Sequence, residues 1–178
     1  MKTLIRQIHT IVTCDDGDRI LHGASLLLDG GVIASLDAAD DAQADRVIDG
    51  RNLFVYPGLV NTHHHLYQYF TRNLPQVQGF ALFDWLTALY GIWAGLDADI
   101  VYQSSLAGMA ELMRYGCTTC FDHHYVFPTG QEGVIDAQFE AAAALGIRMH
   151  ASRGSMSLSQ KDGGLPPDSV VQPLEPIL

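Results

Sequence analysis

Beyond Pro57-Gly58, short apolar segments alternate with helical patterns of about a dozen residues, and this alternation restricts the fold most. Leu59–Thr62, Cys117–Asp122 and Ile147–Ala151 read as strands. Strands separated by helices of this length pair in parallel, because each helix carries the chain back to the edge where the previous strand began. The alternation therefore predicts an α/β fold built from βαβ units.

The expected helices carry recognisable ends. Asp97 or Asp99 can cap a helix that stops at Gly116, a residue suited to the position after a helix. Its apolar positions fall on one face: Tyr102, Leu106, Met109, Leu112 and Met113. An Ala-rich helix is expected over Gly133–Leu145, ending at Gly146.

The number of βα units indicates how much of a barrel the chain could form. A (β/α)8 TIM-like barrel takes about 250 residues, roughly 30 per unit. Residues 57–178 hold three clear strands. We therefore expect them to be the first βα units of such a barrel, truncated to less than half.

Residues 1–56 have a different pattern, with no helical periodicity. Short strands are expected at Leu4–Thr13, Ala24–Leu28, Val32–Leu36, Arg46–Ile48 and Leu53–Val55. Asp29-Gly30-Gly31 suits a tight hairpin between the second and third of them. The pattern predicts the N-terminal part of a small β-sandwich.

Composition narrows the possible partners and location. Hydrophobic residues make up 48% of the chain, enough for a sizeable core, and the formal net charge is -10. An acidic chain repels polyphosphate, so we expect no nucleic acid polymer as partner. We also expect no membrane span or signal peptide. Three cysteines form no paired framework, which favours a reducing cytoplasm.

Two histidines directly after the first barrel strand are candidate metal ligands. Residues two apart in a strand share a face, so His63 and His65 should project together and His64 away from them. Barrels present their functional residues at this end of the strands. Imidazole nitrogen suits zinc and also ferrous iron. The alternative is a histidine-rich surface loop without function.

The motif Pro57-Gly58-Leu59-Val60-Asn61-Thr62-His63-His64-His65 resembles the opening signature of the amidohydrolase superfamily. Gly116-Cys117-Thr118-Thr119 resembles its branch of purine, pyrimidine and triazine aminohydrolases. Further segments resemble 8-oxoguanine deaminases and their hydroxyatrazine-hydrolase relatives, and they cover nearly the whole chain: His63–Gln68, Phe83–Leu86, Asp122–Tyr125, Arg153–Ser157 and Gly163–Asp168.

The resemblance implies a hydrolase acting on C–N bonds of cyclic amidines. It implies one metal per subunit, zinc or sometimes iron, held by His63, His65, a further His and an Asp. The metal would activate water to attack a ring carbon, and ammonia would leave. The family's proton-transfer residues, a Glu, a second His and that Asp, are expected beyond Leu178. The catalytic residues are therefore unassigned, and we expect the 178-residue chain alone to be inactive.

Several side chains are candidate substrate contacts. The amide of Gln68 can both donate to and accept from a purine edge. Trp85 could stack on a planar base, although a Trp beside Phe83 and Leu86 is more often part of a core. Tyr67 and Tyr125 are candidates of the same kind.

The ends of the second and third strands supply two further candidates. His123 and His124 are adjacent and face opposite ways, so at most one should reach the site. Arg153 could hold a carbonyl oxygen or an anionic base, or form a structural ion pair. Cys117 and Cys120 have the spacing of a redox or zinc motif, but on a strand they lie on opposite faces, which argues against it.

The leading hypothesis is hydrolytic deamination of a free purine-type base such as 8-oxoguanine. Alternatives within the same chemistry are an s-triazine chlorohydrolase or aminohydrolase and a deaminase of guanine, isocytosine or an adenosine derivative. A cyclic amide hydrolase resembling dihydroorotase is a weaker one. A non-catalytic scaffold or binding protein is the alternative of another class. The apolar stretch Phe80–Trp93 could belong to a core or to a homo-oligomer interface.

Overall fold

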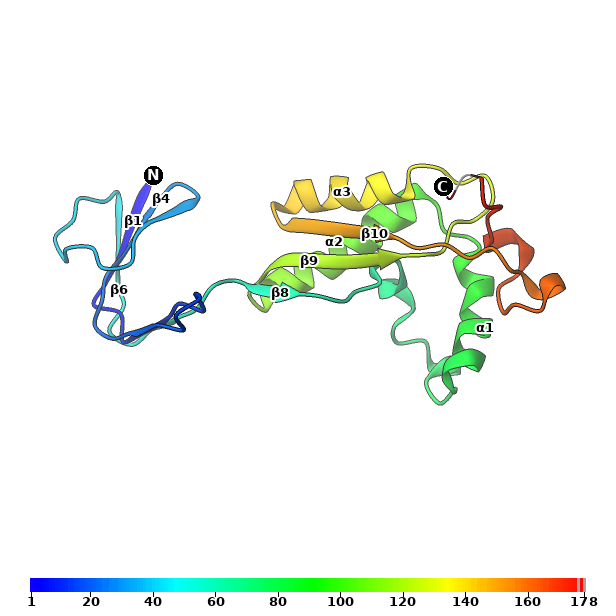
Figure 1. Cartoon of the computed structure of the whole chain (residues 1–178), viewed down its shortest axis with the longest axis horizontal. Coiled ribbons are helices and arrows are strands. Elements are labelled where there is room, and N and C mark those ends of the chain that lie inside the picture. Colours follow the sequence, from blue (N-terminus) through cyan, green and yellow to red (C-terminus); the bar gives the residue numbers. More distant parts are fainter. Residues whose placement is uncertain (176, 178) are drawn as a thin grey trace. The chain divides into compact units, whose positions relative to one another are not determined.

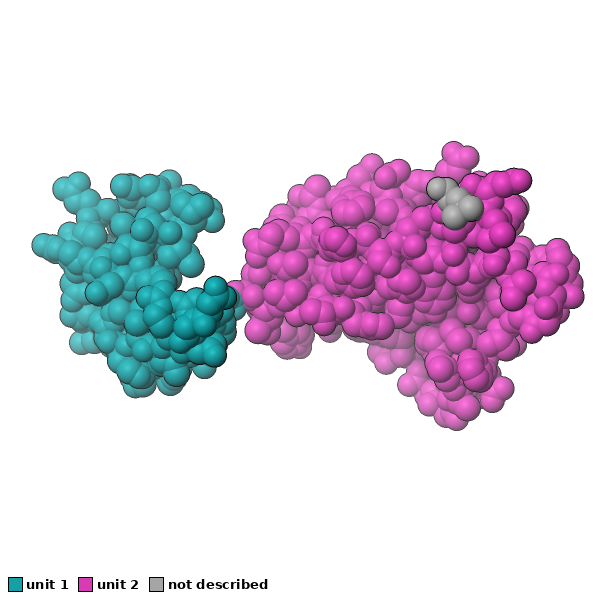
Figure 2. Space-filling view, viewed as in Figure 1, with its two compact units in different colours: residues 1–57 teal, residues 58–178 magenta. Residues whose placement is uncertain are grey.

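The computed structural model describes residues 1–175 and 177. The chain forms two compact units, residues 1–57 and residues 58–178, coloured separately in Figure 2. Each unit has its own hydrophobic core. In the described part of the chain, no helix is both long and apolar enough to cross a bilayer.

The first unit consists of two small mixed sheets. One has the order β5-β4-β1-β6 and the other the order β3-β2-β7. The strands are β1 (Lys2–Arg6), β2 (Thr10–Val12), β3 (Ile20–Leu21), β4 (Leu26–Asp29), β5 (Val32–Ser35), β6 (Arg46–Asp49) and β7 (Phe54–Val55). Ile8, Ile11 and Leu26 form the buried centre. Gly30, at φ 60°, lies between the antiparallel strands β4 and β5, as the Asp-Gly-Gly pattern predicted.

The expectation of one continuous strand over Leu4–Thr13 is wrong. Gln7 has a φ of 54°, a left-handed conformation that a strand cannot contain. Its backbone N–H donates to Ser25 Oγ at 2.9 Å. The break lets β1 join one sheet and β2 the other, so both sheets can share a core.

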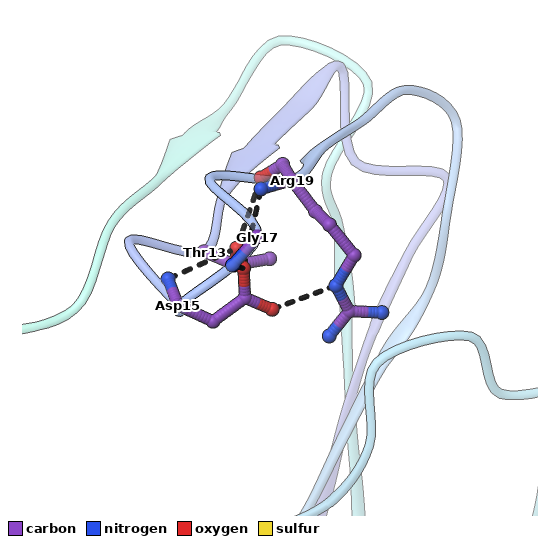
Figure 3. Close-up of polar contacts among 4 residues, drawn as sticks. All are labelled: Thr13, Asp15, Gly17 and Arg19. Carbon is purple, nitrogen blue, oxygen red and sulfur yellow. Dashed lines mark hydrogen bonds and ion pairs between the residues drawn. The ribbon is translucent and has the colours of Figure 1, made fainter.

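The loop between β2 and β3 is closed by a compact set of polar contacts (Figure 3). Asp15 Oδ1 accepts from the backbone N–H groups of Gly17 and Arg19, both at 3.2 Å. Arg19 Nε donates to Asp15 Oδ2 at 2.6 Å. Hydrogen bonds from Arg19 lower the pKa of Asp15 to about 2. This loop lies in the first unit and carries none of the candidate site residues.

The second unit is organised around a parallel sheet of order β10-β9-β8 (Figure 1). Its strands are β8 (Leu59–Asn61), β9 (Cys117–His124) and β10 (Arg148–Arg153). Its α-helices are α1 (Leu82–Trp93), α2 (Ala98–Arg114) and α3 (Val134–Leu145). Short 3-10 helices are η1 (Leu66–Thr71), η2 (Pro75–Val77), η3 (Gln160–Asp162) and η4 (Asp168–Val170).

The predicted alternation of strands and helices is confirmed, and the strand order follows the chain order. Helix α2 contacts β9, α3 contacts β10, and the two helices pack on each other. These are the opening βα units expected of a barrel, and they form only part of one. Several ends differ from prediction, because β8 stops at Asn61 and β9 continues to His124.

The two faces of β9 have different environments. Cys120, Asp122 and His124 are fully buried, whereas Phe121 and His123 are partly exposed. Alternation along a strand puts these two groups on opposite faces. Cys120 belongs to the cluster around Met109 of α2, so the buried group faces the helices.

His124 is therefore a buried histidine packed beside Tyr67, with ring centroids 4.8 Å apart. Its Nε2 lies 2.7 Å from the carbonyl oxygen of Val126. A carbonyl only accepts, so Nε2 carries the proton. Burial lowers the pKa of His124 to about 4, so the ring is neutral at pH 7.

Between the two predicted caps of α2, the structure selects Asp97, which accepts from the Ile100 N–H at 2.8 Å. We expect Asp97→Ala to lower the free energy of unfolding by about 1 kcal/mol. Asp99→Ala removes only a favourable charge from the first turn, a loss of about 0.5 kcal/mol. Urea unfolding followed by circular dichroism measures both values. Equal losses would contradict the assignment of Asp97.

The burial of His124 predicts a pH-dependent stability. Between pH 6.5 and about 4, the unfolded chain binds a proton that folded His124 does not. The free energy of unfolding should therefore decrease as the pH is lowered from 6.5 to about 4, by on the order of 3 kcal/mol. Urea unfolding at several pH values should show a flatter profile for His124→Phe. Phe127→Leu, which alters the same packing without removing a titratable group, should keep the wild-type profile.

Candidate functional site

His63 and His65 lie in the segment that joins β8 to η1, and their ring centroids are 4.9 Å apart. His65 Nδ1 lies 2.7 Å from the carbonyl oxygen of His123. Because a carbonyl only accepts, Nδ1 carries a proton, and in the neutral tautomer the lone pair is therefore on Nε2. Histidines that bind metals are held by such a bond from their other ring nitrogen. This bond orients His65 as in a metal-bound histidine, and His63 lies beside it.

The structure brings His63 and His65 together, but strand alternation is not the reason. Strand β8 ends at Asn61, so all three histidines lie beyond it. His63, His64 and His65 all line a cavity of about 520 Å³, and the rings of His63 and His65 pack edge to face. The opposite orientation of His64 stays a prediction. Burial lowers the pKa of His64.

The histidine segment is fastened to the end of β9. The His123 N–H donates to the His64 carbonyl oxygen at 2.9 Å. The Leu66 N–H donates to Asp122 Oδ1 at 2.6 Å. Sequence reasoning assigned no role to Asp122. The available signal was a carboxylate two residues after Cys120, on the same face of the strand as that apolar side chain.

His123 lies beside the pair, as one of the two adjacent histidines was expected to. Its ring centroid is 5.7 Å from that of His65. Its Nδ1 is 2.6 Å from Ser152 Oγ on β10, a neighbour that the sequence did not reveal. A Cβ on Gly154 would meet the His123 ring at 2.8 Å, so glycine permits this close packing. His124 faces the helices and takes no part.

Gln68 also lies at this site and lines the cavity with the histidines. Its Nε2 donates to the hydroxyl oxygens of Tyr67 and Tyr125 at 3.1 and 3.3 Å. Burial raises the pKa of both tyrosines, so their hydroxyls remain protonated. The ring of Tyr125 is 5.3 Å from that of His65. The group combines hydrogen-bonding atoms with aromatic edges, which suits a flat heterocycle.

The cavity is also lined by polar groups that sequence reasoning missed. Tyr69 donates its hydroxyl to Glu111 Oε2 at 2.8 Å, and the Arg72 guanidinium pairs with the same oxygen. The Arg72 guanidinium also lies 4.1 Å from the centre of the Tyr69 ring. Only the i, i+3 spacing of Tyr69 and Arg72 hinted at a shared face.

Trp85 and Arg153 are engaged elsewhere. The Trp85 ring is 5.5 Å from that of Trp93, in the core cluster of the second unit, which matches its alternative interpretation as a core residue. Arg153 donates to Gln172 Oε1 at 2.6 Å and lies over the Phe127 ring at 4.3 Å. The roles of Trp85 in stacking and of Arg153 in anion binding stay predictions.

Cys117 and Cys120 are both buried. Cys117 Sγ donates to the Thr119 carbonyl oxygen at 3.1 Å. Burial raises the pKa of Cys120 to about 12, which leaves an unreactive thiol. The burial of both thiols is consistent with a role in packing rather than in redox chemistry or metal binding.

His63 and His65 could supply two nitrogen ligands, and zinc takes three or four from a protein. Among residues 1–175 and 177, no group of three or more His, Cys, Asp or Glu side chains could hold a metal ion. The pair therefore fits part of a ligand set.

Curated proteins that match most of this chain include two bacterial enzymes. The 8-oxoguanine deaminase of Pseudomonas aeruginosa is 42% identical over 179 residues, covering 99% of this chain. The hydroxydechloroatrazine ethylaminohydrolase of Pseudomonas sp. strain ADP is 38% identical over 181 residues, covering 94% of this chain. The chain spans 39% and 38% of the lengths of these relatives.

Comparison with solved structures gives a consistent result. The atrazine chlorohydrolase of Arthrobacter aurescens TC1, crystallised with zinc, has a TM-score of 0.87 and 36% identity. That match covers 97% of this chain and 40% of the other. The Amidohydrolase family matches residues 54–176, which include the histidine pair, all of β9 and all of β10. The chain therefore belongs to the amidohydrolase family.

Proposed function

We propose that the protein carrying this chain is a metal-dependent deaminase of a free purine-type base, with 8-oxoguanine as substrate. The observation that carries the proposal is the 42% identity to an 8-oxoguanine deaminase across 99% of this chain. The reaction would replace the exocyclic amine with oxygen from water and release ammonia. The net charge of -10 favours a free base over a lesion within DNA.

We assign His63 and His65 to a single zinc ion. Zinc would supply Lewis acid chemistry that activates water near neutral pH. The bond from His65 Nδ1 to the His123 carbonyl would leave Nε2 as the nitrogen that binds the metal. Gln68 has its amide nitrogen bonded to two tyrosine hydroxyls, so Oε1 is the atom that would accept from a ring N–H. Iron in place of zinc remains the alternative metal.

A second candidate is hydrolysis of an s-triazine. It is favoured by the 38% identity to the hydroxydechloroatrazine ethylaminohydrolase and by the structural match to the atrazine chlorohydrolase. The leaving group would then be an alkylamine or chloride. Both proposed reactions act on a flat, nitrogen-rich ring beside the metal, so a metal held by His63 and His65 is compatible with either reaction. We further propose a cytoplasmic location and assembly as a homo-oligomer.

Product release separates these candidates. The full natural chain, loaded with zinc, should release ammonia from 8-oxoguanine faster than from guanine, isocytosine or an adenosine derivative. It should release little alkylamine or chloride from s-triazines. Good turnover of another ring without activity on 8-oxoguanine would refute the substrate. A zinc-loaded protein inactive on the whole panel would favour the non-catalytic scaffold.

Metal analysis tests the ligand pair. His63→Ala and His65→Ala each remove a ligand, so zinc affinity should fall by more than the roughly 10–100-fold that loss of an outer partner costs. His64→Gln is the matched control, because it changes the adjacent side chain and keeps the carbonyl that binds the His123 N–H. Zinc content and competition with a chromophoric chelator provide the measurement. Equal losses in all three variants would contradict the assignment.

A further inference from the structure

We propose that Asp122, supported by Gln138, is a positioning residue that holds His65 in its metal-binding orientation. This inference rests on the proposed zinc site. Asp122 is fully buried on β9, on the face that packs against the helices. Its Oδ1 accepts the Leu66 N–H at 2.6 Å, and its Oδ2 accepts Gln138 Nε2 at 2.8 Å. One carboxylate thus joins the strand, the residue after His65 and helix α3.

A buried carboxylate is costly, so its retention needs an explanation. Burial raises the pKa of Asp122. Cys120, two residues earlier on the same face, shows that an apolar side chain suffices for packing there. What an apolar residue cannot do is accept the Leu66 N–H. That N–H begins η1, where amides lack partners within the helix, and Leu66 is itself fully buried.

The contact acts on His65 through two neighbouring bonds. The His123 N–H binds the His64 carbonyl, and His65 Nδ1 binds the His123 carbonyl. With the Asp122 contact, three consecutive residues of the histidine segment are tied to two consecutive residues of β9. Loss of the Asp122 bond would free the peptide on the C-terminal side of His65. The imidazole could then swing away from the His123 carbonyl.

Gln138 provides a way to separate geometry from charge. It is fully buried, and in the described part of the chain its Oε1 has no hydrogen-bond partner. In Asp122→Asn, the Asn oxygen can still accept the Leu66 N–H. The Asn amide nitrogen can donate to Gln138 Oε1 once that amide turns over. Asp122→Asn should therefore preserve the anchor, and Asp122→Leu should remove it.

The experiment uses the full natural chain and three variants, Asp122→Leu, Asp122→Asn and the control Cys120→Ala. Cys120→Ala perturbs packing on the same face of the same strand without touching the histidine segment. Zinc affinity should fall about 10–100-fold in Asp122→Leu. It should stay close to wild type in Asp122→Asn and Cys120→Ala. Gln138→Leu should cause a smaller loss than Asp122→Leu.

A second readout needs no metal. Amide hydrogen exchange in the metal-free protein should be faster at residues 63–66 in Asp122→Leu, and unchanged there in Asp122→Asn. Unaltered exchange at these residues in Asp122→Leu overturns the proposal. A zinc affinity of Asp122→Leu equal to that of Cys120→Ala would also overturn it. A wild-type protein that binds no zinc refutes the proposed function instead, whereas Asp122-dependent protection at Leu66 would still support the anchor.

Discussion

The pairing between the end of strand β9 and residues 64–66 is the interaction on which the candidate site depends. Strand β8 stops at Asn61, so its ladder cannot hold the histidines. Three hydrogen bonds to Asp122 and His123 replace the ladder. They fix both the course of the segment and the tautomer of His65. The central position of β9 in the sheet makes this possible, because it is paired on both sides.

Buried polar groups surround this junction. Asp122 and His124 both occupy the helix-facing side of β9, where water cannot solvate them. Asp122 accepts hydrogen bonds from Leu66 and Gln138, and His124 Nε2 donates to the nearby Val126 carbonyl, which satisfies these buried groups. The opposite face carries His123, which contacts Ser152 and lies beside His65. On one face of β9, Asp122 thus holds the backbone of the histidine segment at Leu66. On the other face, the His123 ring lies beside His65.

Family membership and local geometry support the proposed chemistry in different ways. The match to residues 54–176 places the chain among amidohydrolases, while the bond to the His123 carbonyl shows how the candidate ligand His65 is oriented. The choice of ring depends on softer features, namely the amide of Gln68 and the hydroxyls of Tyr67 and Tyr125. Amide and hydroxyl groups suit planar nitrogen heterocycles of several kinds. The chain is similar both to an 8-oxoguanine deaminase and to a hydroxydechloroatrazine ethylaminohydrolase.

The sequence by itself determined the α/β class, the parallel strands and the proximity of His63 and His65, since periodicity and short spacing are local properties. It also allowed either Asp97 or Asp99 as a cap, and hydrogen-bond geometry selected Asp97. Only the tertiary structure decided that β8 ends before the histidines, that Arg153 binds Gln172, and that Asp122 anchors Leu66. The anchor joins residues 56 positions apart, and no local pattern encodes which buried amide a distant carboxylate will meet.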